Sequence, residues 1–70
     1  MGIEPLIRMA NQIASNYAHH PPEQAAAEVA AHLTSFWAPP MRAALADYVH
    51  EGGAGVDPVV VMALEQVPRP

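Results

Sequence analysis

The sequence predicts an all-α protein, a small bundle of three to four short helices with Pro/Gly connections. Apolar residues recur at steps of three and four along most of the chain, which is the spacing of one helix face. Proline is favoured in the first turn of a helix, and prolines stand at similar intervals at Pro5, Pro22, Pro40 and Pro58. We therefore expect a single helical domain over residues 1–70, with helices at roughly 5–19, 22–37, 40–51 and 58–66.

The first expected helix, over roughly residues 5–19, has the clearest pattern. Its apolar residues form one stripe: Leu6, Met9, Ala10, Ile13, Ala14 and Tyr17. Polar side chains fall on the opposite side, so the helix is amphipathic. We expect it to end near His19 or His20, because Pro21-Pro22 follow and a proline disfavours the α conformation of the residue before it.

The second expected helix, 22–37, begins with a strongly helix-forming run that is rich in alanine and glutamate. Its apolar stripe consists of Ala26, Val29, Ala30, Leu33 and Phe36. The small alanine side chains should allow a neighbouring helix to approach closely. Because Pro39-Pro40 prevent this helix from continuing, they predict a corner at which Phe36, Trp37 and Met41 gather.

The third expected helix, 40–51, ends at Gly52-Gly53, since glycine readily adopts the left-handed conformation of a helix C-cap. Asp57-Pro58 then combines a favourable N-cap with a proline at the first helical position. Three consecutive valines at 59–61 would suit a strand by propensity. A short helix is favoured, because a lone strand in a helical chain would have nothing to pair with. Pro68-Arg69-Pro70 cannot continue this helix, and we expect a loose tail there.

The charge balance and composition restrict the classes of partner. The formal net charge is −4, with seven acidic and three basic residues, so we expect neither a nucleic-acid binder nor a protein that binds anionic membranes. Neither a membrane-spanning run nor a signal peptide is recognisable, and we expect a soluble cytoplasmic protein. A chain of 70 residues that is 51% hydrophobic, 14% charged and free of cysteine should have an apolar surface that binds a partner.

We expect no catalytic, cofactor-binding or metal site in this chain. The four histidines are dispersed along the sequence, and His19 and His20 are adjacent and cannot point the same way on a helix, so surface histidines are favoured over metal ligands. The hydroxyl residues lack a recognisable base nearby, and no strand precedes the glycine-rich stretch as a phosphate loop would require. An enzyme acting by itself is therefore disfavoured.

Aromatic and basic residues are the candidates for partner contact. Phe36 and Met41 lie on apolar stripes, which favours packing within the bundle, whereas Trp37 at the corner fits the core and a partner surface equally well. Arg8 and Arg42 each lie in or just after the first turn of a helix, where the helix dipole disfavours a cation. A carboxylate should offset this, either in the same chain, which is favoured, or on another subunit, and plain solvation is the third alternative.

Several blocks of the sequence are required neither by the helical period nor by composition. They are Leu6-Ile7-Arg8-Met9-Ala10-Asn11-Gln12-Ile13-Ala14, Ala31-His32, Phe36-Trp37 with Pro39 and Met41-Arg42, Gly52-Gly53 with Gly55, and Asp57-Pro58. Together they cover nearly the whole chain and resemble the delta subunits of cytoplasmic NAD-dependent, molybdenum-containing formate dehydrogenases.

The resemblance implies a non-catalytic accessory subunit without a cofactor of its own. The larger catalytic and diaphorase subunits would carry a molybdenum or tungsten pterin cofactor, iron–sulfur clusters and FMN, and would oxidise formate with NAD. The delta subunit would bind them and support assembly, cofactor maturation or stability of the complex. The candidate partner-binding residues are Arg8, Asn11, Gln12, Phe36, Trp37, Met41 and Arg42. The alternative is a free-standing helical protein-interaction or regulatory domain, which could be homodimeric.

Overall fold

The computed structural model describes residues 2–67 and contains four helices: α1 (Glu4–Ser15), α2 (Pro22–Phe36), α3 (Pro39–His50) and α4 (Pro58–Gln66). No strand occurs in this part of the chain, so the predicted all-α fold class is confirmed. The three valines at 59–61 lie within α4 and are helical. The segment Pro68-Arg69-Pro70, for which we expect a loose tail, lies outside the described residues.

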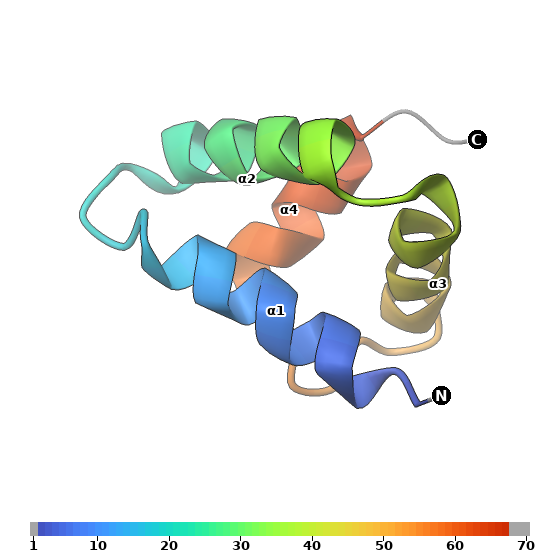
Figure 1. Cartoon of the computed structure of the whole chain (residues 1–70). Coiled ribbons are helices and arrows are strands. Elements are labelled where there is room, and N and C mark those ends of the chain that lie inside the picture. The colour runs from blue at the N-terminus through green and yellow to red at the C-terminus, as the bar shows by residue number, and fades with distance from the viewer. Residues whose placement is uncertain (1, 68–70) are drawn as a thin grey trace.

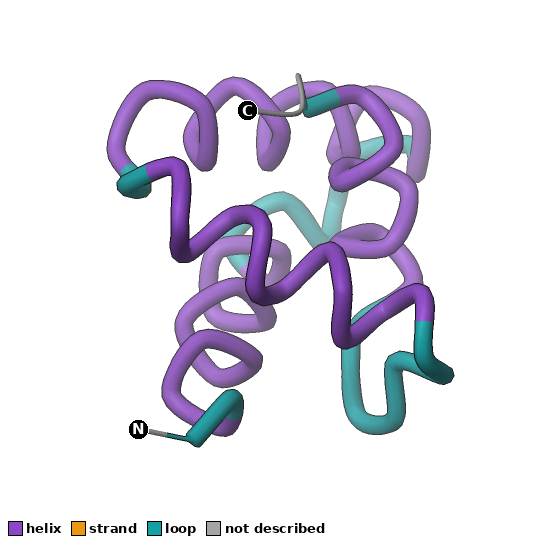
Figure 2. The backbone as a smooth tube through the Cα atoms, turned by 90° about the vertical axis from the view of Figure 1, so that its right-hand side faces the viewer, coloured by secondary structure: helices purple, strands orange, loops and turns teal. Residues whose placement is uncertain are grey.

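The helices form two layers around a shared core. Figure 1 shows α1 and α2 running in roughly opposite directions, joined by the turn at residues 16–21, with α4 behind them. Helix α3 stands beside the start of α1 and the end of α2, and packs against α1 and α4. Figure 2, turned by 90°, shows that the connections between the helices are short.

Prolines lie at the start of all four helices, as the sequence predicts, although α3 begins at Pro39, one residue before the predicted start at Pro40. Pro22, Pro39 and Pro58 are the first residues of their helices, and Pro5 is the second residue of α1. Asp57 caps α4, because its Oδ1 accepts a hydrogen bond of 2.8 Å from the backbone N–H of Val59. The side chains of the other N-cap residues make no such bond. Proline geometry therefore sets the other starts by fixing φ.

Helix α1 ends at Ser15, four residues before the end that the sequence predicts. From Asn16 to His20 the backbone continues in tighter turns, with bonds such as Tyr17 N to Ala14 O (3.0 Å) and His20 N to Tyr17 O (3.0 Å). These bonds span three residues instead of four, which is the pattern of a 3₁₀ helix and is common at helix ends. The His20 ring packs on Tyr17, with the ring centroids 5.7 Å apart.

Helix α3 ends at the glycine pair that the sequence predicts as its C-cap. Gly53 N donates to Tyr48 O and Gly52 N donates to Val49 O, both at 3.1 Å, which is the hydrogen-bond pattern of a Schellman motif. Both glycines have positive φ, 132° at Gly52 and 64° at Gly53. An L side chain rarely adopts such angles, so glycine is required to end this helix and direct the chain toward α4.

The core is built from small side chains. Its buried residues come from all four helices and include the C-cap residues of α2 and α4. They are Ala10, Ala14, Ala26, Val29, Ala30, Leu33, Trp37, Leu45, Val60, Ala63 and Val67. The most extensive helix contact is that between α2 and α4. Ala26 in α2 and Ala63 in α4 are fully buried, which is consistent with the close approach that the alanines predict.

Of the two aromatic residues at the end of α2, Phe36 takes a position that differs from the predicted one, and Trp37 takes one of the two that the sequence leaves open. Trp37 is 8% exposed and belongs to the core, whereas Phe36 is 75% exposed, so the prediction that Phe36 fills the core is wrong. The buried stripe of α2 continues from Leu33 by a step of four residues to Trp37, and Phe36 falls beside it. Trp37 is extended (φ −90°, ψ 139°), which ends the helix while its ring stays in the core.

No helix in residues 2–67 has the length and apolarity needed to cross a membrane.

We predict that the contact between α2 and α4 has no room for a larger side chain at Ala26. Ala26→Leu should lower the free energy of unfolding by about 1–3 kcal/mol, because it inserts a branched side chain into a filled core. Ala27→Leu, one residue along at an exposed position, should change it by less than about 0.5 kcal/mol. Urea denaturation of both variants measures the difference, and equal stability would contradict the close packing.

Candidate partner-binding groove

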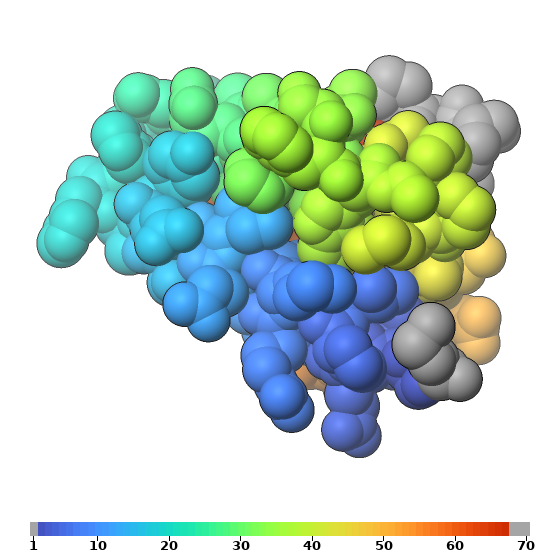
Figure 3. All heavy atoms as spheres, viewed as in Figure 1, coloured from blue at the N-terminus to red at the C-terminus, as the bar shows by residue number. Residues whose placement is uncertain are grey.

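A groove opens between the middle of α1 and the C-terminal half of α2. It has a volume of about 350 Å³ and is lined by Arg8, Met9, Gln12, Ile13, His32 and Trp37. Figure 3 shows the C-terminal end of α2 (light green) against the middle of α1 (blue) on this face. Four of the lining residues come from α1 because steps of three and four along a helix place residues on one side.

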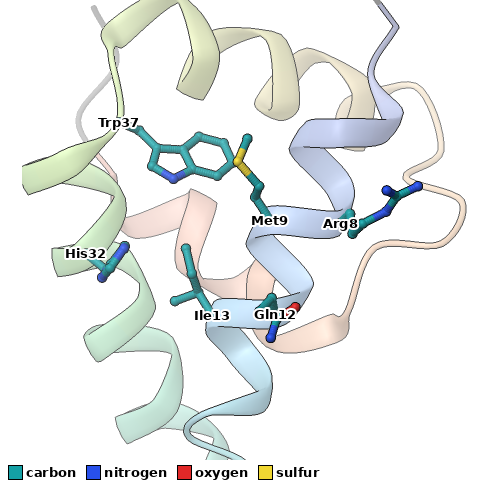
Figure 4. Close-up of a pocket in the computed structure, with 6 residues that line it drawn as sticks. All are labelled: Arg8, Met9, Gln12, Ile13, His32 and Trp37. Atoms are coloured by element: carbon teal, nitrogen blue, oxygen red, sulfur yellow. The ribbon is translucent and has the colours of Figure 1, made fainter.

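The interior of the groove is apolar and aromatic. In Figure 4 the Trp37 indole lies between α2 and α1, with Met9 at one end of the ring and Ile13 facing it. Met9 is 42% exposed, although its place on the α1 stripe predicts a core position. Ile13 is half-buried and packs against the core. Trp37 therefore closes the groove toward the core while Met9 stands open to solvent.

Phe36 and His32 form an exposed aromatic pair on α2 next to the groove. Their ring centroids are 4.8 Å apart and the rings are tilted by 43°. The two residues are one helical turn apart, so their side chains lie on the same side of α2. His32 contributes to the groove wall, and the 75% exposed ring of Phe36 extends the apolar surface beyond it. An exposed aromatic side chain of this size is a common anchor in protein interfaces.

Arg8 and Gln12 stand at the rim of the groove on α1. Both side chains are exposed, and in Figure 4 the Arg8 guanidinium extends away from the groove interior. Within residues 2–67, Arg8 has no hydrogen-bond or ion-pair partner. The prediction that a carboxylate of the same chain pairs with Arg8 is therefore wrong for the described residues. Its charge is available to a molecule in the groove.

Arg42 points inward and holds the end of α2. Its Nη1 donates to the carbonyl oxygen of Trp37 at 2.6 Å and approaches that of Leu33 at 3.4 Å. Among the described residues, Arg42 therefore pairs with backbone carbonyl oxygens, and not with a carboxylate of the same chain as predicted. The physical role is similar, because the C-terminal end of a helix carries the negative end of its dipole. This explains how α3 tolerates a cation in its first turn.

Asn11 also has an internal role. Its Nδ2 donates to Gly55 O at 2.8 Å, and its Oδ1 accepts from Asp57 N at 2.9 Å. Both ends of the amide thus hold the connection between α3 and α4 against α1. Contact of Asn11 or Arg42 with a partner stays a prediction.

Met41 lies apart from the groove. It packs against the core and lines a second hollow of about 360 Å³ at the start of α1, together with Gly2, Ile3, Pro5, Leu6, Pro40 and Ala44. The structure therefore brings Arg8, Gln12, Phe36 and Trp37 together on one face and separates Met41 from them.

The polar groups of the groove are suited to binding. Within residues 2–67, no three His, Asp or Glu side chains gather closely enough to hold a metal ion. The groove lining includes no serine, threonine or carboxylate. Its polar groups are a guanidinium, an amide, an imidazole and an indole N–H, which suit recognition of oxygen acceptors.

Sequence reasoning missed three residues of the groove. Met9 and Ile13 have core-like positions on an amphipathic helix, and their exposure depends on where α2 ends. For His32 a signal exists, since its spacing of four residues from Phe36 places the two rings on one side of a helix.

Comparison with models of known protein families matches residues 5–64 to the NADH-dependent formate dehydrogenase delta subunit family, FdsD. The match covers most of the 70 residues, including the groove and the Asn11 contacts. Comparison with curated proteins gives no match, and comparison with solved structures gives none either.

We predict that the Asn11 amide stabilises the fold. Asn11→Ala removes two hydrogen bonds, and at about 0.5–1.5 kcal/mol for each bond this should lower the free energy of unfolding by about 1–3 kcal/mol. Asn16→Ala is the matched control, because Asn16 is exposed at the end of the same helix, and its effect should stay within about 0.5 kcal/mol. Equal losses in urea denaturation would show that the Asn11 contacts contribute nothing.

Proposed function

Because the chain belongs to the family of NADH-dependent formate dehydrogenase delta subunits, we propose that it is an accessory subunit that binds the larger subunits of such an enzyme. It has no catalytic activity by itself and holds no cofactor. The family match over residues 5–64 is the observation that carries this proposal. The groove between α1 and α2 and the exposed Phe36 ring beside it supply the binding surface.

The partners in this proposal are the catalytic and diaphorase subunits in the cytoplasm. They carry the molybdenum or tungsten pterin cofactor, the iron–sulfur clusters and FMN, and they oxidise formate with NAD. The delta subunit supports assembly, cofactor maturation or stability of the complex. A domain of 70 residues buries a smaller fraction of its surface on folding than a large domain does, so docking on larger subunits would also stabilise the domain itself.

The chemistry of the groove supports a binding role. Its interior is formed by Met9, Ile13 and the Trp37 ring, which attract apolar side chains. No carboxylate or hydroxyl group lines it, so it lacks a candidate general base or nucleophile of that kind. The large exposed aromatic surface at Phe36 would be covered by the partner, since such surface is costly to leave in water.

We predict that Phe36→Ala weakens the association with the larger subunits. Burying a phenylalanine ring contributes about 1.5–3 kcal/mol, so the dissociation constant should rise by at least about tenfold. Gln66→Ala, at an exposed position on α4 outside the groove, should leave it unchanged. The larger subunits are coexpressed with each tagged variant, and co-purification, biolayer interferometry and formate-dependent NAD reduction of the eluate are measured.

The fold of Phe36→Ala is checked by circular dichroism, and the exposed position predicts an unchanged melting curve. Unchanged binding by the folded variant would contradict this face as the interface. If the wild-type chain elutes alone or as its own dimer and recovers no larger subunit, the accessory-subunit proposal fails and the free-standing interaction domain becomes the better account.

A further inference from the structure

The groove contains a hydrogen-bond donor that the chain itself does not use. Trp37 is 8% exposed, so more than nine-tenths of its surface is buried. In Figure 4 the indole nitrogen lies on the ring edge that faces His32 and Ile13, inside the groove. No described residue accepts a hydrogen bond from this nitrogen. Within residues 2–67, the only side-chain nitrogen that is both fully enclosed and unpaired is Arg42 Nε, so the unpaired Trp37 nitrogen is not fully enclosed. The Trp37 N–H is therefore reachable through the groove.

A buried indole N–H usually finds an acceptor, because an unmade hydrogen bond in an apolar site is costly. Here the ring is held by its packing in the core, and the Arg42 bond to the Trp37 carbonyl oxygen holds the backbone from which the ring extends. The donor thus has a fixed direction before any partner arrives, which reduces the entropy lost on binding. An oxygen acceptor entering the groove would complete this site.

The other residues that line the groove indicate which side chains of a partner would bind beside that oxygen acceptor. Met9 and Ile13 give the groove an apolar side, and Met9 is flexible enough to adapt to the shape of an entering side chain. Arg8 at the rim is a cation without a partner among the described residues, although the whole chain carries a net charge of −4. No carboxylate lines the groove itself, so the charged side chain at its rim is the Arg8 guanidinium, which attracts a negatively charged residue of a partner.

We propose that the groove receives a peptide segment of a larger subunit, which inserts an apolar side chain against Met9 and Ile13, accepts a hydrogen bond from Trp37 Nε1 through a backbone or carboxylate oxygen, and places an acidic residue beside Arg8. This inference rests on the proposed function and names the chemistry of the partner at that same site.

A second copy of this chain fits the groove less well. In a symmetric dimer the same patch meets itself, so each Arg8 would face a groove that is lined by another Arg8 and no carboxylate. The complementary partner is therefore a different protein with an acidic segment.

The single tryptophan makes the N–H directly observable in the wild-type protein. The chain is labelled with ¹⁵N-tryptophan and combined with the purified, deuterated larger subunits, and the one indole resonance is recorded by transverse-relaxation-optimised NMR. Hydrogen bonding in the complex should move the indole proton downfield and slow its exchange with deuterium by at least about tenfold. This measurement needs no variant that could fail to fold.

Two substitutions test the separate contacts through the dissociation constant. Trp37→Phe keeps an aromatic ring and removes the N–H, and should weaken binding by about 3- to 10-fold. Arg8→Glu reverses the rim charge and should weaken binding by about 10-fold at low salt, with a smaller effect at high salt. Glu65→Lys, which changes an exposed charge on α4, is the matched control.

The outcomes separate this inference from the proposed function. If the wild-type complex forms but the indole resonance stays unchanged, or if both groove variants bind normally, the inserted segment is excluded and the accessory role stands. If the chain binds no larger subunit, both fail. If the indole resonance shifts only on formation of a dimer of this chain, the groove serves self-association and the inference is overturned.

Discussion

The hydrogen bond from Arg42 to the carbonyl oxygen of Trp37, at 2.6 Å, fixes the geometry on which the candidate site depends. It joins the first turn of α3 to the last carbonyls of α2, across a corner where two prolines have removed backbone donors. With the Trp37 carbonyl held there, the indole ring lies in the core and Phe36 lies outside. Trp37 then forms a wall of the groove, and Phe36 pairs with His32 because the two residues are one helical turn apart on α2.

The core around this corner is made largely of alanine and valine, with few large side chains. Alanine allows α2 and α4 to approach closely, but each buried alanine removes little apolar surface from water. A small domain with such a core has a limited free energy of unfolding. Two large apolar side chains, Met9 and Phe36, are exposed on one face, where they bury less apolar surface in the isolated chain than a core position would. This distribution is consistent with a chain that gains stability when it docks on a larger protein.

The residues that resemble the family divide into two groups in the structure. Asn11 and Arg42 are occupied by backbone groups of the same chain and set the positions of the connections. Arg8 and Gln12, on the same helix as Asn11, are exposed at the groove rim. Neighbouring residues of one sequence motif therefore have different roles: some hold the fold together and others form the exposed surface. The reason is that neighbours on a helix point in different directions.

The sequence alone determined the all-α fold, the proline starts of the helices, the Asp57 cap and the glycine end of α3. Each of these depends on local backbone geometry and on interactions between residues close in the chain. Tertiary structure decided which aromatic residue is buried at the end of α2, since Phe36 and Trp37 are both compatible with the helical period near its last turn. It also decided the partners of Arg42 and Asn11, which are backbone groups of other elements. Every residue has a backbone carbonyl, so the amino-acid sequence does not indicate which one a side chain will contact. The packing of the helices determines these partners.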